Sequence, residues 1–501
     1  MTKNKEIFIL ILLSILALFL RWFPIRNGLF TFEYDMAKDS LIMLEMFQYH
    51  DPSLVGATTS IPGLFNGPIW YYLAVIPNII LRFNPFGSVV AVWILVLINI
   101  YLLKRYTNNF IVFIYAVSVG LIGAQQNAWI PYLTTHVMVP ILLLLLNLKS
   151  NKKINNLQIF LLGFLSSLFF HSQAAFGIVF IIILPVILYL KRIKISFKQI
   201  FIGIGGFFLS LSPLILFELK NNFIQSKAVI NFILDFGTQS KIIEPNSSGF
   251  KRIIEIASEM LNVAGQSIFP IELGYFGGFV ALIIFIIYLK KKENNQDILI
   301  LASLILGTFF LYLILPAKAY YLVALYPVWI YLFGTYIYKY QKKYVSPLVI
   351  LFLVLASVQL VNSRNTYNHL SDSSTSLYSS KLAAVNKAYE LVEGKPFRSY
   401  QFVPAVYDYT YQYIYLQNNF KGRYLPTEFS YAPGETTYNT YKHLPPKSPE
   451  SEVVILIIEK YIYENVFDDW WNRVTPNLTI LEEVSISNSI KIIKAKDENF
   501  K

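Results

Sequence analysis

Three carboxylates lie within seven residues near the N-terminal end of this chain: Glu33, Asp35 and Asp39. They follow a long apolar run, in a sequence in which only 14% of residues are charged. If the segment is helical, Asp35 and Asp39 share one face, where like charges repel. Such a pair in low-dielectric surroundings can have one pKa raised, which suits a general base or a metal ligand. The alternative is that Asp35 caps a helix over 36–48 and that Asp39 is solvated.

Further polar candidates lie in loops and at the ends of apolar runs. Each also has an ordinary explanation, such as an aromatic belt at the membrane interface, loop polarity or a structural histidine. Lys318 is the basic residue of a short loop, where a cation can pair with a phosphate; contact with anionic headgroups is the alternative. The candidate binding residues are Asn66, Tyr71, Asn127, His171, Gln173, Glu218, Lys318 and Tyr321.

The overall composition predicts a multi-span membrane protein with some soluble mass. Of the 501 residues, 55% are hydrophobic, and the mean hydropathy is +0.50. The net charge of +12 lies mostly in short loops between apolar runs, so it sets membrane orientation and nucleic acid is excluded as a partner. Cysteine is absent, which excludes disulfides and thiolate metal sites. No motif with metal-ligand spacing occurs and no cofactor is implied, although a divalent metal stays open.

The apolar runs predict about eleven membrane spans, with the N-terminus in the cytoplasm. This orientation places most Lys and Arg loop residues inside, as the positive-inside rule requires, if 67–83 is an interfacial or re-entrant helix. The expected spans are 6–23, 86–103, 109–125, 133–148, 156–171, 174–190, 199–218, 272–289, 297–315, 319–337 and 346–362.

Two domains are expected. Residues 1–362 would form a transmembrane catalytic domain, with an outer loop over 24–85 that carries the acidic motif and a second over 219–271 with amphipathic helices. In the second loop, Ile230, Ile233 and Leu234 mark one apolar stripe, and Ile253, Ile256, Ala257 and Met260 mark another. Residues 363–501 would form a small extracytoplasmic α/β domain, with a helix over 381–392, a strand over 453–458 and two strands over 480–493.

The layout resembles the GT-C membrane glycosyltransferases. It is similar to bacterial family 39, the group of protein O-mannosyltransferases and aminoarabinose-lipid transferases. The resemblance rests on the acidic first outer loop with Asp35-x-x-x-Asp39, then Thr58-Thr59-Ser60 and the helix start Gly67-Pro68-Ile69-Trp70-Tyr71-Tyr72, and it covers about residues 1–360. The fold expected from it is an all-α polytopic membrane protein with a small C-terminal α/β domain.

The resemblance implies an inverting glycosyltransferase that takes a sugar from a polyprenyl phosphate. The family's loop-one acid corresponds to Asp35, with Asp39 as its neighbour. The family's adjacent Asp-Glu pair is missing here, because Glu33 and Asp35 flank Tyr34, so which of the three carboxylates is the base stays open. The expected partners are the lipid-linked donor, membrane lipids and an unidentified glycan, lipid or protein acceptor.

Two other functions are compatible with the sequence. One is a lipid or polysaccharide flippase, which would need polar residues along the spans to line a path. The mid-span regions here are mostly Ile, Leu, Phe and Val, whereas the polar candidates collect at one face. The other is a lipid-A or O-antigen ligase-type enzyme of a different fold. The sugar transferase is the leading hypothesis, acting at the outer face of the cell membrane.

Overall fold

The computed structural model divides the chain into two compact units, each assembled from separate stretches of sequence. Unit 1 comprises Met1–Arg21, Ser53–Trp70 and Ala91–Leu360, and unit 2 comprises Trp22–Pro52, Tyr71–Val90 and Val361–Lys501. The acidic segment near the N-terminus therefore belongs to the same unit as the C-terminal residues. The structure describes residues 3–59, 61–234, 249–291, 295–315, 318–404, 407–435, 451–461 and 464–500.

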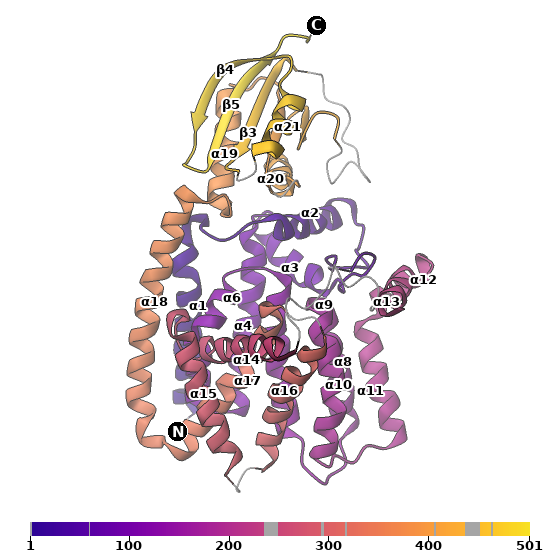
Figure 1. Cartoon of the computed structure of the whole chain (residues 1–501), viewed down its shortest axis with the longest axis vertical. Helices are drawn as coiled ribbons and strands as arrows, with labels where there is room; N and C mark the ends of the chain where they lie inside the picture. The colour runs from indigo at the N-terminus through magenta and orange to yellow at the C-terminus, as the bar shows by residue number, and fades with distance from the viewer. Residues whose placement is uncertain are drawn as a thin grey trace. The chain divides into compact units, whose positions relative to one another are not determined.

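Long apolar helices make up most of unit 1 (Figure 1). In the described ranges, seven helices are long and apolar enough to cross a membrane, or up to eight if one bent pair counts as a span. The protein is therefore a multi-pass membrane protein, and the expected count of eleven spans is approximate. The helices of unit 1 are α5 (Asn109–Val117), α6 (Val119–Gln125), α7 (Thr134–Asn147), α8 (Asn156–Ser167), α9 (Phe169–Ser172), α10 (Ala174–Leu190), α11 (Phe197–Ser210), α12 (Ser212–Lys220), α13 (Ile224–Leu234), α14 (Gly249–Gln266), α15 (Gly274–Leu289), α16 (Asn295–Ile314) and α17 (Tyr326–Tyr340), with 3-10 turns η2 (Ile130–Leu133), η4 (Ile271–Leu273), η6 (Ala319–Leu325) and η7 (Lys342–Tyr344).

Four helices contribute residues to both units: α1 (Lys3–Ile25), α3 (Ile69–Ile80), α4 (Phe86–Tyr106) and α18 (Val345–Ser373). Of these, α3 is the segment expected to stay at the membrane surface. Its 12 residues rise about 18 Å, which is well short of a hydrocarbon core of about 30 Å. The length of α3 therefore fits an interfacial or re-entrant helix better than a span.

The run expected as one span over 109–125 is broken at Ser118 into α5 and α6. A break leaves carbonyl groups at the end of the first helix without helical partners. The fully buried guanidinium of Arg21 donates to the Ala116 carbonyl at 3.0 Å and, through two nitrogens, to Gln125 Oε1 at 2.9 and 2.7 Å. Arg21 thus holds both sides of the break, a contact that hydropathy alone does not predict.

The run expected as one span over 199–218 is also bent. Helices α11 and α12 meet at an angle of 67° around Leu211. Pro213 lies in the first turn of α12, and a proline cannot donate the backbone hydrogen bond that would continue α11. The bend therefore follows from a residue inside the apolar run.

Helix α14 is amphipathic, as expected for the second outer loop, and Figure 1 shows it lying across α15 and α16. Its buried face includes Arg252, Ile256 and Met260, whereas Ile253, expected on the apolar stripe, is 43% exposed. The first stripe is exposed as well, at Ile230 and Leu234, which suits contact with lipid. Residues 235–248 of this loop lie outside the described residues, as does the side chain of Ile233.

Helices α14 and α15 pack closely because glycines line their contact. A Cβ on Gly265 would lie 1.6 Å from the Gly274 carbonyl oxygen, and one on Gly278 would lie 2.0 Å from that of Leu261. Small residues at such contacts let two backbones approach each other. The close packing fixes the position of α14, which carries Arg252.

Unit 2 contains a five-stranded mixed sheet with strand order β2-β1-β3-β5-β4. Strand β1 pairs in parallel with β2 and β3, and β5 pairs antiparallel with β3 and β4. The expected helix and strands of the C-terminal region are confirmed. The elements are α2 (Tyr34–Tyr49), α19 (Tyr378–Leu391), α20 (Tyr409–Phe420), α21 (Glu464–Val474), β1 (Arg398–Phe402), β2 (Glu428–Ser430), β3 (Val453–Glu459), β4 (Leu478–Ser485) and β5 (Ile490–Asp497), with the turn η1 (Arg26–Gly28).

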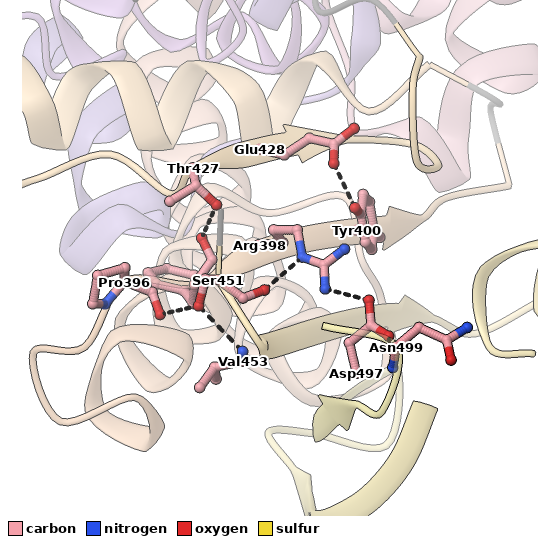
Figure 2. A network of polar contacts seen from close by, with 10 residues as sticks. Pro396, Arg398, Tyr400, Thr427, Glu428, Ser451, Val453, Asp497 and Asn499 are labelled. Carbon is pink, nitrogen blue, oxygen red and sulfur yellow. Dashed lines mark hydrogen bonds and ion pairs between the residues drawn. The ribbon is translucent and has the colours of Figure 1, made fainter. Parts of the chain in front are cut away.

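Hydrogen bonds and an ion pair between polar side chains link the strands at one end of this sheet, as Figure 2 shows. Arg398 at the start of β1 donates to the Ser451 carbonyl at 2.9 Å and to Asp497 Oδ2, at the end of β5, at 2.6 Å. Tyr400 donates to Glu428 Oε2 at 2.5 Å and so ties β1 to β2. These contacts join strands that are up to about a hundred residues apart in sequence. They thereby stabilise the pairing of the strands in the sheet.

Candidate active site

The acidic segment opens helix α2. Glu33 is the N-cap in extended conformation, without a side-chain capping hydrogen bond, and the helix begins at Tyr34. Asp35 therefore lies inside the first turn, so the alternative that Asp35 caps the helix is wrong. An acidic residue in the first turn is still favoured by the helix dipole. Glu33 and Asp35 are both exposed.

Asp39, one turn after Asp35, is buried with 4% exposure, which contradicts the alternative that it is solvated. Its Oδ1 accepts a hydrogen bond from the Tyr71 hydroxyl at 2.8 Å. Burial raises the pKa of Asp39 to about 8; the Tyr71 hydrogen bond opposes this shift, and the charge of Asp35 adds to it. Asp39 is therefore mostly protonated at neutral pH, while Asp35 faces solvent. The two carboxyl groups have different environments and suit different roles.

The pKa of Asp39 leads to a pH-dependent contribution to stability. The pKa is raised in the folded protein, so folding takes up a proton between about pH 4 and pH 8, and stability from this group falls as pH rises through that window. Asp39→Asn cannot ionise and can still accept from Tyr71. We expect the unfolding temperature of wild type to fall relative to Asp39→Asn as pH rises from 5 to 8.5. Parallel curves for the two proteins would show that Asp39 does not titrate in this range.

Charged groups of the C-terminal region influence the pKa of Glu33. Its pKa is raised first by partial desolvation of the carboxylate, then lowered by Lys381 and raised by Asp35 and Glu459. Lys381 and Glu459 form a buried ion pair at 3.0 Å, and the Tyr411 hydroxyl donates to Glu459 at 2.9 Å. Part of the electrostatic setting of the acidic segment therefore comes from residues more than 300 positions later in the sequence.

In unit 1, His171 holds the backbone around Gly67. The Ile69 N–H donates to His171 Nδ1 at 3.4 Å, and the Gly67 N–H donates to the Phe170 carbonyl at 2.9 Å. His171 Nε2 lies 3.1 Å from the Ser210 carbonyl and 3.0 Å from its hydroxyl, so both ring nitrogens are engaged within the protein. With Nδ1 accepting, the proton is assigned to Nε2. This geometry favours a positioning role for His171 over direct substrate binding.

Position 67 requires glycine, because the Cβ of any other residue would lie 2.0 Å from His171 Nδ1. The ring cannot move without losing its bonds to Ser210. We expect Gly67→Ala to destabilise the protein by about 1–3 kcal/mol, measured as a lower unfolding temperature. The double variant Gly67→Ala/His171→Ala should cost less than the sum of the two single changes, because the clash is then absent. Strict additivity would show that the two residues do not collide.

A second set of side chains in unit 1 combines aromatic rings with cations; we call Trp129, Arg252, Lys318, Tyr320 and Tyr321 the aromatic–basic corner. The rings of Trp129 and Tyr320 are 4.9 Å apart, and those of Tyr320 and Tyr321 are 4.7 Å apart. The Lys318 ammonium is exposed and lies 5.9 Å from the Tyr320 ring centroid. Such a group can bind an anion while its rings contact lipid or sugar.

Arg252 of the corner was not a candidate from sequence. It is 4% exposed, and its Nη2 donates to the Tyr312 and Leu315 carbonyls at 3.0 and 3.2 Å, just before Lys318 in sequence. Glu255 accepts from Nη1 at 3.2 Å, and Nε has no hydrogen-bond partner among the residues that the structure describes. A signal existed, because Arg252 lies four residues before Ile256 and eight before Met260, on the stripe that the helix buries.

Three predicted binding residues have buried polar atoms without partners in the described part of the chain. They are Asn66 Oδ1, Asn127 Oδ1 and both amide atoms of Gln173. A buried polar atom left unpaired costs about 1–3 kcal/mol, so such atoms mark places for water or a ligand. Glu218 differs, because it accepts from Gln225 N, Ser226 N and Ser226 Oγ at 2.9, 2.8 and 2.6 Å. It caps the start of α13 and thus has a structural task.

Comparison with known proteins gives a match in fold. No family model and no curated protein matches the sequence. The solved structures that match in fold include ArnT from Cupriavidus metallidurans bound to undecaprenyl phosphate, and ArnT from the same organism in the apo state. Both superpose with a TM-score of 0.55 over 97% of this chain and 97% of theirs, at 11% and 10% identity. The chain has the fold of ArnT. The expected class, a GT-C-like polytopic protein with a small C-terminal α/β domain, is therefore confirmed.

The ArnT-like fold distributes the predicted residues over both units. Unit 2 holds Glu33, Asp35, Asp39 and Tyr71, of which Asp39 and Tyr71 are in direct contact. Unit 1 holds the other predicted binding residues. Within the described ranges, no three or more His, Cys, Asp or Glu residues gather closely enough to hold a metal ion.

Proposed function

We propose that this protein transfers a sugar from a polyprenyl-phosphate donor to an acceptor hydroxyl or amine. The observation that carries the proposal is the ArnT fold along 97% of both chains, since one of the matching ArnT structures is bound to undecaprenyl phosphate. Within unit 2 the acidic segment offers carboxylates for such a reaction, and within unit 1 the aromatic–basic corner offers a cation for a phosphate.

In this proposal Asp35 is the general base. Its exposed carboxylate takes the proton of the acceptor as the acceptor oxygen or nitrogen bonds to the anomeric carbon. The bond from that carbon to the phosphate oxygen breaks, and the polyprenyl phosphate leaves with the electron pair. A single displacement of this kind inverts the anomeric centre. Buried, largely protonated Asp39 positions α2 through Tyr71 and keeps a second negative charge away from Asp35.

The carrier phosphate is assigned to Lys318 of unit 1. Lys318 offers an exposed ammonium, whereas the Arg252 guanidinium is buried, is held by two carbonyls and Glu255, and so supports the chain just before Lys318. Charge-assisted contacts with phosphate strengthen as the leaving group gains negative charge, so they lower the barrier as well as bind the donor. The adjacent tyrosine and tryptophan rings supply apolar area for the carrier.

The direct test is donor turnover by the purified protein. A panel of radiolabelled polyprenyl-phosphate sugars is incubated with the protein in detergent, and release of the lipid phosphate is followed with and without acceptors. We expect transfer or slow hydrolysis with at least one sugar, and its loss in Asp35→Asn. Absence of turnover with every donor, together with movement of the intact lipid across proteoliposomes, would support the flippase alternative.

The buried polar cluster around Arg21 bears on that alternative, because polar residues within spans can line a transport path. Gln126 donates to the Arg21 carbonyl at 3.3 Å, the Gln125 amide donates to the Tyr115 hydroxyl at 3.3 Å, and Asn99 donates to the same hydroxyl at 3.2 Å. Arg21 also donates to the Ala116 carbonyl at the end of α5 and to Gln125, so these polar side chains are hydrogen-bonded within the cluster. They stabilise the break between α5 and α6 and give the flippase no specific support.

The proposed reaction at the outer face requires an inside N-terminus and an outside C-terminal region. The Lys and Arg distribution of the loops motivates this orientation. We expect reporter fusions after Lys153 and Lys343 to be cytoplasmic and a fusion after Ser373 to be external. A cytoplasmic reporter at Ser373 would overturn the outer-face assignment of the acidic segment, since both belong to unit 2.

A further inference from the structure

Three tyrosine rings gather beside the acidic segment in unit 2; we call Tyr34, Tyr407 and Tyr409 the tyrosine cluster. Tyr34 lies 5.3 Å from Tyr409 at an interplanar angle of 22°, and 5.4 Å from Tyr407 at 38°. Tyr407 and Tyr409 are 5.4 Å apart at 24°. Tyr409 is thus stacked with both other rings, whereas Tyr34 and Tyr407 are tilted relative to each other. Tyr407 is 54% exposed and the other two are half-buried, so the cluster presents aromatic surface to solvent.

Tyr34 directly precedes Asp35 in the first turn of α2, so the cluster adjoins the acidic segment along the chain. Desolvation raises the pKa of Tyr34, and the charges of Asp35 and Tyr407 add to this shift. The cluster consequently combines aromatic faces, phenolic hydroxyls and a carboxylate within one small region of a single unit.

Hydrogen bonds of the buried residue Asp408 hold the segment that carries Tyr407 and Tyr409. Asp408 between them is 2% exposed, and its Oδ1 accepts from Gln412 Nε2 at 2.6 Å. Its backbone carbonyl accepts from the Tyr411 and Gln412 N–H groups at 2.9 and 3.1 Å, which starts α20. Its Oδ2 has no partner among the described residues. A buried anchor of this kind holds the backbone between the two tyrosines, and preorganisation favours binding.

From this geometry we infer that the tyrosine cluster binds a sugar ring of the acceptor, so that the acceptor is a carbohydrate or a carbohydrate-bearing lipid. The inference rests on the proposed function. A sugar ring has an apolar C–H face and a rim of hydroxyls; tyrosine rings match the face, and the phenolic hydroxyls and carboxylates of Glu33 and Asp35 match the rim. Tyrosine also binds with little loss of side-chain freedom. The bound hydroxyl would then lie beside the proposed base.

The test measures acceptor binding without donor. Full-length protein in lipid nanodiscs is mixed with methyl α-mannoside, methyl β-glucoside, N-acetylglucosamine or a serine-containing tetrapeptide, and saturation-transfer NMR follows the ring protons of each probe. We expect at least one sugar to bind, and Tyr407→Ala to weaken it about fivefold or more. Tyr407→Phe keeps the ring but loses the hydroxyl, and it should weaken binding less than Tyr407→Ala. Tyr49→Ala, which removes an exposed tyrosine at the other end of α2, is the matched control.

Donor hydrolysis without acceptor is measured on wild type and on the control Tyr49→Ala, which should keep the wild-type rate. Hydrolysis of a donor without Tyr407-dependent sugar binding would overturn this inference while the proposed function stands. Sugar binding that depends on Tyr407, without turnover of any donor, would support the cluster as a sugar site and count against the proposed function. Binding of the tetrapeptide in place of the sugars would identify a protein acceptor and refute the carbohydrate assignment.

Discussion

Asp35→Asn is expected to lower kcat by at least about 100-fold while the protein still folds. A general base typically contributes about 100- to 10,000-fold, and asparagine cannot accept the proton of the acceptor. Asparagine has nearly the same volume, and the helix cap is Glu33, so the start of α2 is preserved. The measurement is release of polyprenyl phosphate in the presence of acceptor, with the unfolding temperature recorded in parallel.

Asp39→Asn is the matched control for Asp35→Asn, because it makes the same chemical change one turn later. Asp39 is buried and mostly protonated near neutral pH, so its neutral analogue should lose far less activity. Near-normal turnover of Asp35→Asn would remove it from the catalytic role. A large loss in Asp39→Asn alone would move that role to Asp39.

Lys318→Ala is expected to raise KM for the lipid donor about tenfold or more, with a smaller change in kcat. Hydrogen bonds to charged groups contribute about 1.5–3 kcal/mol, which corresponds to about 10- to 150-fold in affinity. The lower part of this range is expected, because Lys318 is exposed and solvent screens its charge. Lys318→Arg keeps a cation and should recover most of the loss.

Lys343→Ala serves as the control for Lys318, since it removes a lysine of a loop predicted to be cytoplasmic. Its donor kinetics should match wild type. Added salt should weaken donor binding to wild type more than to Lys318→Ala, because only wild type has this contact to screen. Equal donor kinetics for Lys318→Ala and wild type would reduce Lys318 to a contact with membrane headgroups.

Much of the architecture could be predicted from sequence, because it follows from local properties. A run of apolar residues long enough to cross a bilayer is favoured as a helix wherever it occurs. The strand at Val453–Glu459 was predictable for a similar reason, because its β-branched residues favour a strand buried in a sheet. Interruptions of an apolar run were harder to predict. Pro213 marks the bend before α12 in the sequence. At the other break Ser118 caps α6 locally, but the partner of the Ala116 carbonyl is Arg21, 95 residues earlier.

The roles of the site residues depended on contacts between distant segments. Sequence placed Asp35 and Asp39 on one helix face, but the burial that separates their environments comes with Tyr71, 32 residues away. Arg252 acquires its partners from the end of α16, and the tyrosine cluster unites residue 34 with residues 407 and 409. The chain by itself thus determined a membrane protein with an acidic segment after its first apolar helix and a small sheet domain. Only the tertiary structure decided which carboxylate is shielded from water and which side chains surround the other, because desolvation and charge proximity depend on distances in space and not on spacing in sequence.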